Sequence, residues 1–174
     1  MTTRTEKLQR KGRGPVKLQY LILLCALPVQ ALAACAFDTN LKPFHVARSS
    51  LVDTADLPAP EVEEVSFTRG LGGGAVCDQL GFLTVKLRWP RGDYDLEDIG
   101  FEYRVVRGEA PEGLVPQGPV VASSIRGRRT EHQLTWVDGP PAEQQPLRLL
   151  LELRAVTADG WRGPPVQFRV GAMP

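Results

Sequence analysis

The sequence predicts an all-β fold, a single antiparallel β-sandwich over residues 61–174. Two stretches alternate apolar and polar side chains, Phe82–Pro90 and Leu147–Val156. Such a period of two is typical of a strand with one buried face. Five shorter stretches share the pattern, and residues that favour turns separate them. Seven short strands with turns between them favour two packed antiparallel sheets.

The most regular of these strands is Phe82–Pro90. Its apolar face holds Leu83, Val85, Leu87 and Trp89, and Pro90 ends it because proline cannot donate to a ladder. The other predicted strands cover residues 62–68, 101–105, 120–123, 133–137, 147–156 and 166–170.

Leucine fills residues 147–156, so a helix is the alternative for this stretch. The regular spacing of Arg148, Glu152 and Arg154 and the turn at Asp159-Gly160 favour a strand. We predict one core between two sheets, with its centre formed by Leu87, Trp89, Tyr103, Leu151 and Leu153.

Three of the strands resemble those of a fibronectin type III domain. Leu83-Thr-Val-Lys-Leu-Arg-Trp89-Pro90 is similar to that family's second strand with its buried tryptophan, and Gly100-Phe-Glu-Tyr-Arg-Val105 is similar to the third. Leu151–Gly160 followed by Arg162-Gly-Pro164 resembles the sixth strand and its loop. The resemblance covers about residues 60–171 and implies a sandwich of this type or a divergent immunoglobulin-like one. Leu149 departs from it, because the family's corner tyrosine would stand there.

Residues 1–34 predict a cleaved signal peptide. Six basic residues and one acidic residue, Glu6, precede an apolar run from Leu18 to Ala36. A basic segment before a short apolar one is the pattern of an export signal. Pro28 and Gln30 interrupt the run, and a membrane-spanning helix needs about 20 predominantly apolar residues.

The end of this run resembles a bacterial lipobox. The leucine Leu32 and the small residues Ala33 and Ala34 precede Cys35, as the lipoprotein peptidase requires. The resemblance implies cleavage before Cys35, lipidation of its thiol and stable attachment to a membrane through more than one acyl chain. Because Ala36 and not aspartate follows, it implies the outer membrane of a bacterial cell envelope.

An ordinary signal peptidase is the alternative, since small residues stand at the spacing it reads. The thiol of Cys35 would then be free to pair with Cys77 in an oxidising envelope. The protein would in that case be a soluble periplasmic binding or inhibitor protein.

Residues 35–60 have no helical or alternating period and are rich in polar and turn-forming residues. We therefore expect the lipidated N-terminus and a flexible tether there, although Phe44, Val46 and Leu51 could pack against the domain.

Charge excludes a dedicated nucleic-acid binder. The signal peptide holds 6 of the 21 basic residues and 1 of the 20 acidic ones, which leaves 15 and 19 and a net charge of −4. Proteins that bind nucleic acid carry a basic excess. The membrane, through the N-terminal lipid, and an unknown protein or glycan are the partners we expect.

No pattern in the sequence indicates an enzyme, a cofactor or a metal site. His45 lies in the expected tether, and we interpret His132 as a polar residue at the start of a strand, so neither histidine has a nucleophile or ligand partner. The acidic loop Asp93–Asp98 could hold Ca²⁺ weakly, but solvated carboxylates are the simpler interpretation. Trp161 and Arg162 follow the turn at Gly160, and we expect this loop to face a partner.

Overall fold

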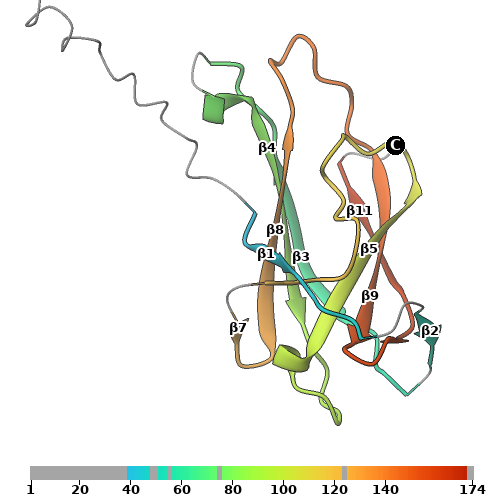
Figure 1. Cartoon of the computed structure of the whole chain (residues 1–174). Coiled ribbons are helices and arrows are strands. Elements are labelled where there is room, and N and C mark those ends of the chain that lie inside the picture. The colour runs from blue at the N-terminus through green and yellow to red at the C-terminus, as the bar shows by residue number, and fades with distance from the viewer. Residues whose placement is uncertain (1–38, 48–50, 55, 74–75, 123–124, 172–174) are drawn as a thin grey trace, which may run out of the picture. The chain divides into compact units, whose positions relative to one another are not determined.

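The computed structural model describes residues 39–47, 51–54, 56–73, 76–122 and 125–171. Two β-sheets pack against each other in this part of the chain (Figure 1). Sheet A consists of β1 (Leu41–Pro43), β2 (Val52–Asp53), β5 (Ile99–Arg107), β6 (Val120–Ala122), β9 (Leu149–Thr157), β10 (Trp161–Arg162) and β11 (Val166–Val170). Sheet B consists of β3 (Glu61–Thr68), β4 (Leu80–Arg88), β7 (Ile125–Arg126) and β8 (Arg129–Val137). The predicted all-β sandwich is confirmed.

The strand order of sheet A is β1-β6-β5-β9-β10-β2, and β11 pairs with β9 as well; that of sheet B is β3-β4-β8-β7. All pairs are antiparallel except β2 with β10, which is parallel. Each of the seven predicted strands is present. The additional strands β1, β2, β7 and β10 have two or three residues, too few to show a period of two.

The core between the sheets contains all five residues predicted to be its centre, each of them at most 4% exposed. Trp89 follows the last residue of β4 and continues its inward face. The Trp89 ring packs edge-on against Phe101, with ring centroids 6.3 Å apart. The Trp89 Nε1–H donates a hydrogen bond to the backbone oxygen of Tyr94, 2.9 Å away. This bond satisfies the polar atom that a buried tryptophan carries.

Strand β9 is the centre of sheet A and is buried on both faces. It pairs with β5 along one side and with β10 and β11 along the other. On its outer face, Glu152 and Val156 are buried too, at 5% and 0% exposure. The strand interpretation of this stretch is confirmed and the helix alternative is wrong. Leu149 is fully buried and pairs with Val170, so the corner keeps its strand pairing without a tyrosine hydroxyl.

The described residues 39–47 and 51–54, here called the N-terminal strap, are bonded to the sandwich. β1 adds to the edge of β6. Just before it, the Asn40 side chain bonds to the backbone of β8: its Nδ2 donates to the oxygen of Glu131 (2.7 Å), and its Oδ1 accepts from the nitrogen of Gln133 (2.8 Å). Thr39 Oγ1 donates to the oxygen of Gln133 (2.6 Å). The strap therefore connects an edge of sheet A to an edge of sheet B.

Farther along the chain, the strap reaches the opposite edge of sheet A. The ring of Phe44 lies so close to Gly100 that a Cβ at that glycine would overlap it. The backbone nitrogens of Val52 and Thr54 donate to the oxygens of Gly160 and Arg162, each at 2.8 Å. Leu57, three residues after the strap, belongs to the core at 1% exposure.

From Thr39 onward, the described residues of the predicted tether at 35–60 are therefore bonded to the sandwich, which begins before residue 61. The physical reason is that strand edges carry unpaired N–H and C=O groups, which are stabilised by any segment that bonds to them. Thr39, Asn40 and Thr54 are polar residues of the kind that suggested a tether, and they make these bonds. The expectation that Phe44 packs against the domain is confirmed.

His132 is a core residue, and its interpretation as a polar strand-end residue is wrong. Strand β8 begins at Arg129, earlier than expected, which places His132 inside the strand, facing inward and fully buried. Its Nδ1 lies 2.8 Å from the hydroxyl oxygen of Tyr103, and its ring packs edge-on against Phe101. Its Nε2 has no hydrogen-bond partner among the described residues. Burial lowers the pKa of His132 to about 3, so the imidazole is neutral in the fold.

The Trp89→Ala variant tests the core. We expect it to lower the free energy of unfolding by about 3–5 kcal/mol, because it leaves a cavity and removes the indole. That loss approaches the total stability of many domains, about 5–15 kcal/mol. Urea denaturation followed by circular dichroism measures it. Leu71→Ala, at a residue 77% exposed, is the control, and equal losses in both variants would contradict the described core.

The pH dependence of stability tests the neutral state of His132. Its pKa is lower in the folded state than its ordinary value of 6.5, so between these values the unfolded chain binds one more proton. Stability therefore rises with pH in this window. We expect a loss of about 1–2 kcal/mol between pH 6.5 and pH 5, measured by urea denaturation at each pH. In His132→Gln this loss should disappear; an unchanged slope would show that other groups cause it.

Candidate functional site

The predicted signal and lipidation residues Leu32, Ala33, Ala34 and Cys35 lie outside the described residues. Within the described part of the chain, Cys77 is the single cysteine, and it is disulfide-bonded. The two other cysteines of the sequence stand at positions 25 and 35. No helix of the described residues is long and apolar enough to cross a bilayer.

Cys77 lies in the short 3-10 helix η2 (Val76–Gln79), directly before β4. Asp78 of this helix accepts hydrogen bonds at its backbone oxygen from the nitrogens of Leu71 and Gly72, at 2.6 and 3.0 Å. The backbone oxygen of Gln79 accepts from the nitrogen of Asp138 at 2.8 Å. These bonds hold the segment that carries Cys77 against the end of β8.

Asp138 fixes this end of the sandwich. Two nitrogens of Arg69 donate to its carboxylate, each at 2.7 Å, and the nitrogen of Gly70 and Nε1 of Trp136 add bonds at 2.8 and 3.0 Å. Burial by itself would raise the pKa of Asp138, but the hydrogen bonds outweigh burial and the pKa is lowered. A charged, fully bonded carboxylate keeps the loops around Cys77 in place.

Trp161 and Arg162 form strand β10 rather than a loop, between β9 and β2. Successive residues of a strand point to opposite sides, so the two side chains have different surroundings. Trp161 is 36% exposed. Arg162 is partly buried, and its guanidinium is engaged in ion pairs.

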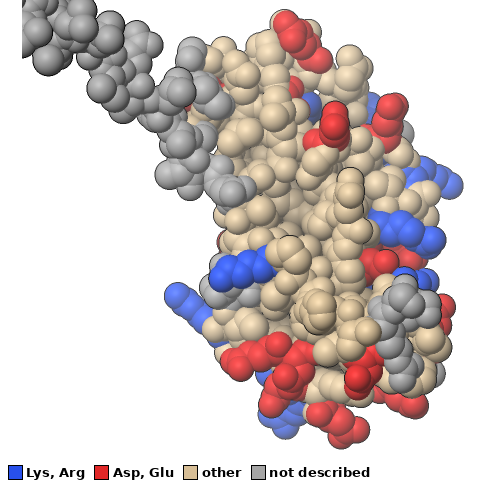
Figure 2. Space-filling view, in the orientation of Figure 1, with Lys and Arg blue, Asp and Glu red and all other residues tan. Residues whose placement is uncertain are grey.

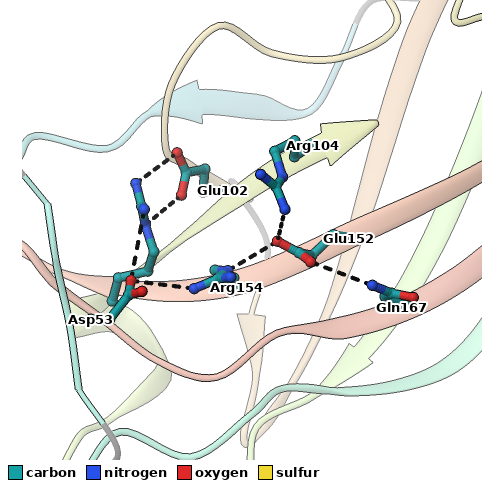
Figure 3. A network of polar contacts seen from close by, with 7 residues as sticks. Asp53, Glu102, Arg104, Glu152, Arg154 and Gln167 are labelled. Atoms are coloured by element: carbon teal, nitrogen blue, oxygen red, sulfur yellow. Dashed lines mark hydrogen bonds and ion pairs between the residues drawn. The ribbon is translucent and has the colours of Figure 1, made fainter. Parts of the chain in front are cut away.

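Arg162 belongs to a polar network on the outer face of sheet A, and Figure 3 labels the other members of this network. Its Nε lies 2.8 Å from Oε2 of Glu102, and its Nη1 lies 3.8 Å from Oδ1 of Asp53. Arg154 bonds to both Asp53 and Glu152, at 3.3 and 3.0 Å. Arg104 and Gln167 complete the network at Glu152. Three arginines and three carboxylates balance in charge, so this network is neutral by itself.

Glu152 is the buried member of that network, at 5% exposure. Burial alone would raise its pKa, but the hydrogen bond and charge of Arg154 and the charge of Arg104 outweigh it, and the pKa is lowered. Removing one member of a buried pair leaves an uncompensated charge. The network therefore connects β2, β5, β9 and β10 to one another. The guanidinium of Arg162 is held in it by Glu102 and Asp53.

The side chain of Trp161 points to the opposite side of β10 from Arg162, and it borders a small hollow of about 110 Å³. Tyr94, also 36% exposed, comes from the β4–β5 loop, and Asp56 comes from the segment after β2. Leu57, Thr54 and Thr157 complete the lining. Sequence reasoning indicated Trp161 but missed Tyr94 and Asp56, because they come from segments far apart in the chain that meet at this hollow only in the fold.

Among the described residues, the remaining candidates do not assemble into a reactive group that is open to solvent. Tyr103 and His132 pair a hydroxyl with an imidazole, but they are 4% and 0% exposed, and burial raises the pKa of the Tyr103 hydroxyl. His45 is exposed. Among the described residues, the acids of the loop Asp93–Asp98 do not gather into a group that could hold a metal ion.

Comparison with known proteins adds no relative: no family model matches the chain, and neither the curated proteins nor the solved structures contain a match.

The Trp161→Ala variant tests the exposure of Trp161. We expect a loss of stability below about 1.5 kcal/mol, because a partly exposed side chain on a two-residue strand leaves no closed cavity. Thermal melting of Trp161→Ala beside Trp89→Ala measures the difference. If both variants lose the same stability, Trp161 is a core residue and its face is not a binding surface.

Proposed function

We propose that this chain is an exported, non-catalytic binding or assembly module of the bacterial cell envelope, built as a fibronectin type III-like sandwich. The observation that carries the proposal is the disulfide bond of Cys77. Disulfides form and persist in oxidising compartments, and proteins of the reducing cytosol rarely contain them. The predicted signal peptide at residues 1–34 supports the same location.

The disulfide also bears on the two proposed forms of the N-terminus. A thiol of Cys35 that carries a lipid cannot join a disulfide. Apart from Cys77, the sequence contains only Cys25 and Cys35, and Cys25 lies within the predicted signal peptide. In a mature chain the partner within the molecule would therefore be Cys35, which favours the soluble periplasmic form over the outer-membrane lipoprotein.

The position of Thr39 supports this pairing. Thr39 bonds to the backbone of Gln133 in β8, and Cys35 stands four positions before it, a reach of at most about 14 Å. The distance along β8 from Gln133 to its end at Val137 is about 13 Å. Val137 pairs with Leu80, three residues after Cys77. The chain before Thr39 is thus long enough to extend to about the end of β8, beside the segment that carries Cys77.

A binding role rests on what the described surface offers. Its polar face on sheet A is internally neutralised, its only imidazole–hydroxyl pair is buried, and an aromatic hollow at Trp161 is open to solvent. An enzyme needs a reactive group beside a base or metal in a site that a substrate can reach. A module that presents an aromatic surface needs neither.

The intact mass of the mature protein from its native host tests the proposal. We expect a chain cleaved after Ala33, without lipid, whose Cys35 and Cys77 react with an alkylating reagent only after reduction. In the Cys77→Ser variant, Cys35 should react without a reductant, because its partner is gone. Cleavage after Ala36 would remove Cys35 and exclude this disulfide.

Two other outcomes decide between the proposed forms. A lipid-modified Cys35, with the protein in the membrane fraction, would establish the lipoprotein form, and Cys35→Ser should then release it from the membrane. An uncleaved chain in the cytoplasm would overturn export altogether, and with it both forms.

A further inference from the structure

The hollow beside Trp161 has the size of a small head group. Its volume of about 110 Å³ equals the liquid volume of roughly three to four water molecules. Sites that enclose whole drug-sized ligands measure about 300–1,000 Å³. The hollow can therefore take the tip of a ligand, and a complete sugar ring or nucleotide would remain largely outside.

Two aromatic side chains border this hollow, Tyr94 and Trp161. Both are partly exposed, at 36% each, so an entering group can contact them. The faces of tryptophan and tyrosine rings attract cations, and alkylammonium groups are recognised in proteins by such rings. Aromatic walls therefore favour a soft organic cation over a hydrated metal ion.

The charge of the lining favours a cation as well. Asp56 borders the hollow, and Thr54 Oγ1, 3.4 Å from the carboxylate, is its hydrogen-bond partner. Among the described residues no basic side chain forms an ion pair with Asp56. Figure 2 shows further acidic side chains gathered toward the lower end of the face it draws, and the loop that carries Tyr94 contributes exposed Asp93, Asp95, Glu97 and Asp98.

The lining is held by the fold and does not depend on a ligand. The backbone oxygen of Tyr94 accepts the hydrogen bond from the core residue Trp89. The nitrogen of Trp161 donates to Oγ1 of the buried Thr157, 3.1 Å away. Thr54 Oγ1 accepts from the nitrogen of Asp56 at 3.2 Å. Preorganised groups lose little entropy when a ligand arrives.

We propose that the hollow bordered by Tyr94, Trp161 and Asp56 binds an alkylammonium group of the quaternary type that choline carries. The rings contact the methyl groups and Asp56 balances the charge. The group can come from free choline or from the head group of a choline lipid, which share this chemistry. The inference rests on the proposed binding role, but it concerns the purified protein and does not depend on how the N-terminus is processed.

A titration followed by ¹⁵N NMR tests it. With choline chloride we expect saturable shifts of the Trp161 indole and of the amides of Thr54 and Asp56, at millimolar concentration. The uncharged isostere 3,3-dimethylbutan-1-ol should bind at least about fivefold more weakly, because it lacks the attraction to the rings and the carboxylate. Sodium chloride at the same ionic strength should leave these signals in place.

Two substitutions with matched controls locate the site. Trp161→Leu should weaken choline binding about fivefold or more, and Asp56→Asn should weaken it about threefold or more. The controls are Phe67→Leu, an aromatic residue on sheet B with 39% exposure, and Glu112→Gln, an exposed acid on another loop. Neither control should change the affinity. Equal effects of Phe67→Leu and Trp161→Leu would contradict the site.

The source of the group is decided by sedimentation with vesicles. Binding to phosphatidylcholine vesicles, but not to phosphatidylglycerol vesicles, supports a lipid head group; choline binding without vesicle binding supports the free solute. The inference is overturned if choline causes no saturable shift, if the uncharged isostere binds equally well, or if glucose shifts the same signals and choline does not. None of these failures affects the mass measurement that tests export and the disulfide.

Discussion

The structure depends on satisfying the backbone groups at the edges of its two sheets. Strand edges that remain unpaired attract other chains, and the N-terminal strap covers three of them. It adds β1 to β6, places the amide of Asn40 on β8, and runs beside β10 as β2. The described residues before the first long strand are therefore part of the domain. Cys35 precedes Thr39, the first described residue that is bonded to the sandwich, by four positions in the sequence.

The strap also connects the core to the surface around Trp161. Leu57 enters the core directly after it, and Asp56 is thereby fixed at the border of the hollow. From the opposite direction, the buried indole of Trp89 holds the backbone of Tyr94. Asp56 and Tyr94, which border the hollow together with Trp161, thus come from segments separated in sequence, and each is positioned by a buried neighbour. A core substitution at Trp89 would accordingly be expected to disturb the surface as well as stability.

The outer faces of the sandwich differ in what they leave available. On sheet A, the network around Glu152 pairs its charges internally, and burial of Glu152 makes each partner necessary. On sheet B, Lys86 pairs with Glu64, and Arg88 and Arg129 with acids of β3. Surfaces whose charges are paired with one another favour solubility more than the binding of a charged partner. Asp56 differs from these paired carboxylates, because among the described residues it has no basic partner. It lies beside two aromatic residues, which makes it a candidate for binding a cation.

The sequence by itself determined the sandwich, its seven main strands and the centre of its core. A period of two identifies a half-buried strand from nearest neighbours alone, as in Phe82–Pro90, where Leu83, Val85, Leu87 and Trp89 all proved to be buried. It also pointed to Trp161 as a surface residue. Only the tertiary structure decided that the described residues between 39 and 60 bond to the sandwich and that His132 is buried. It also decided that Arg162 is held in the polar network and that Tyr94 and Asp56 border the same hollow. These depend on hydrogen bonds and contacts between segments far apart in the chain, which leave no local period: Asn40 is bonded to β8 across more than ninety residues.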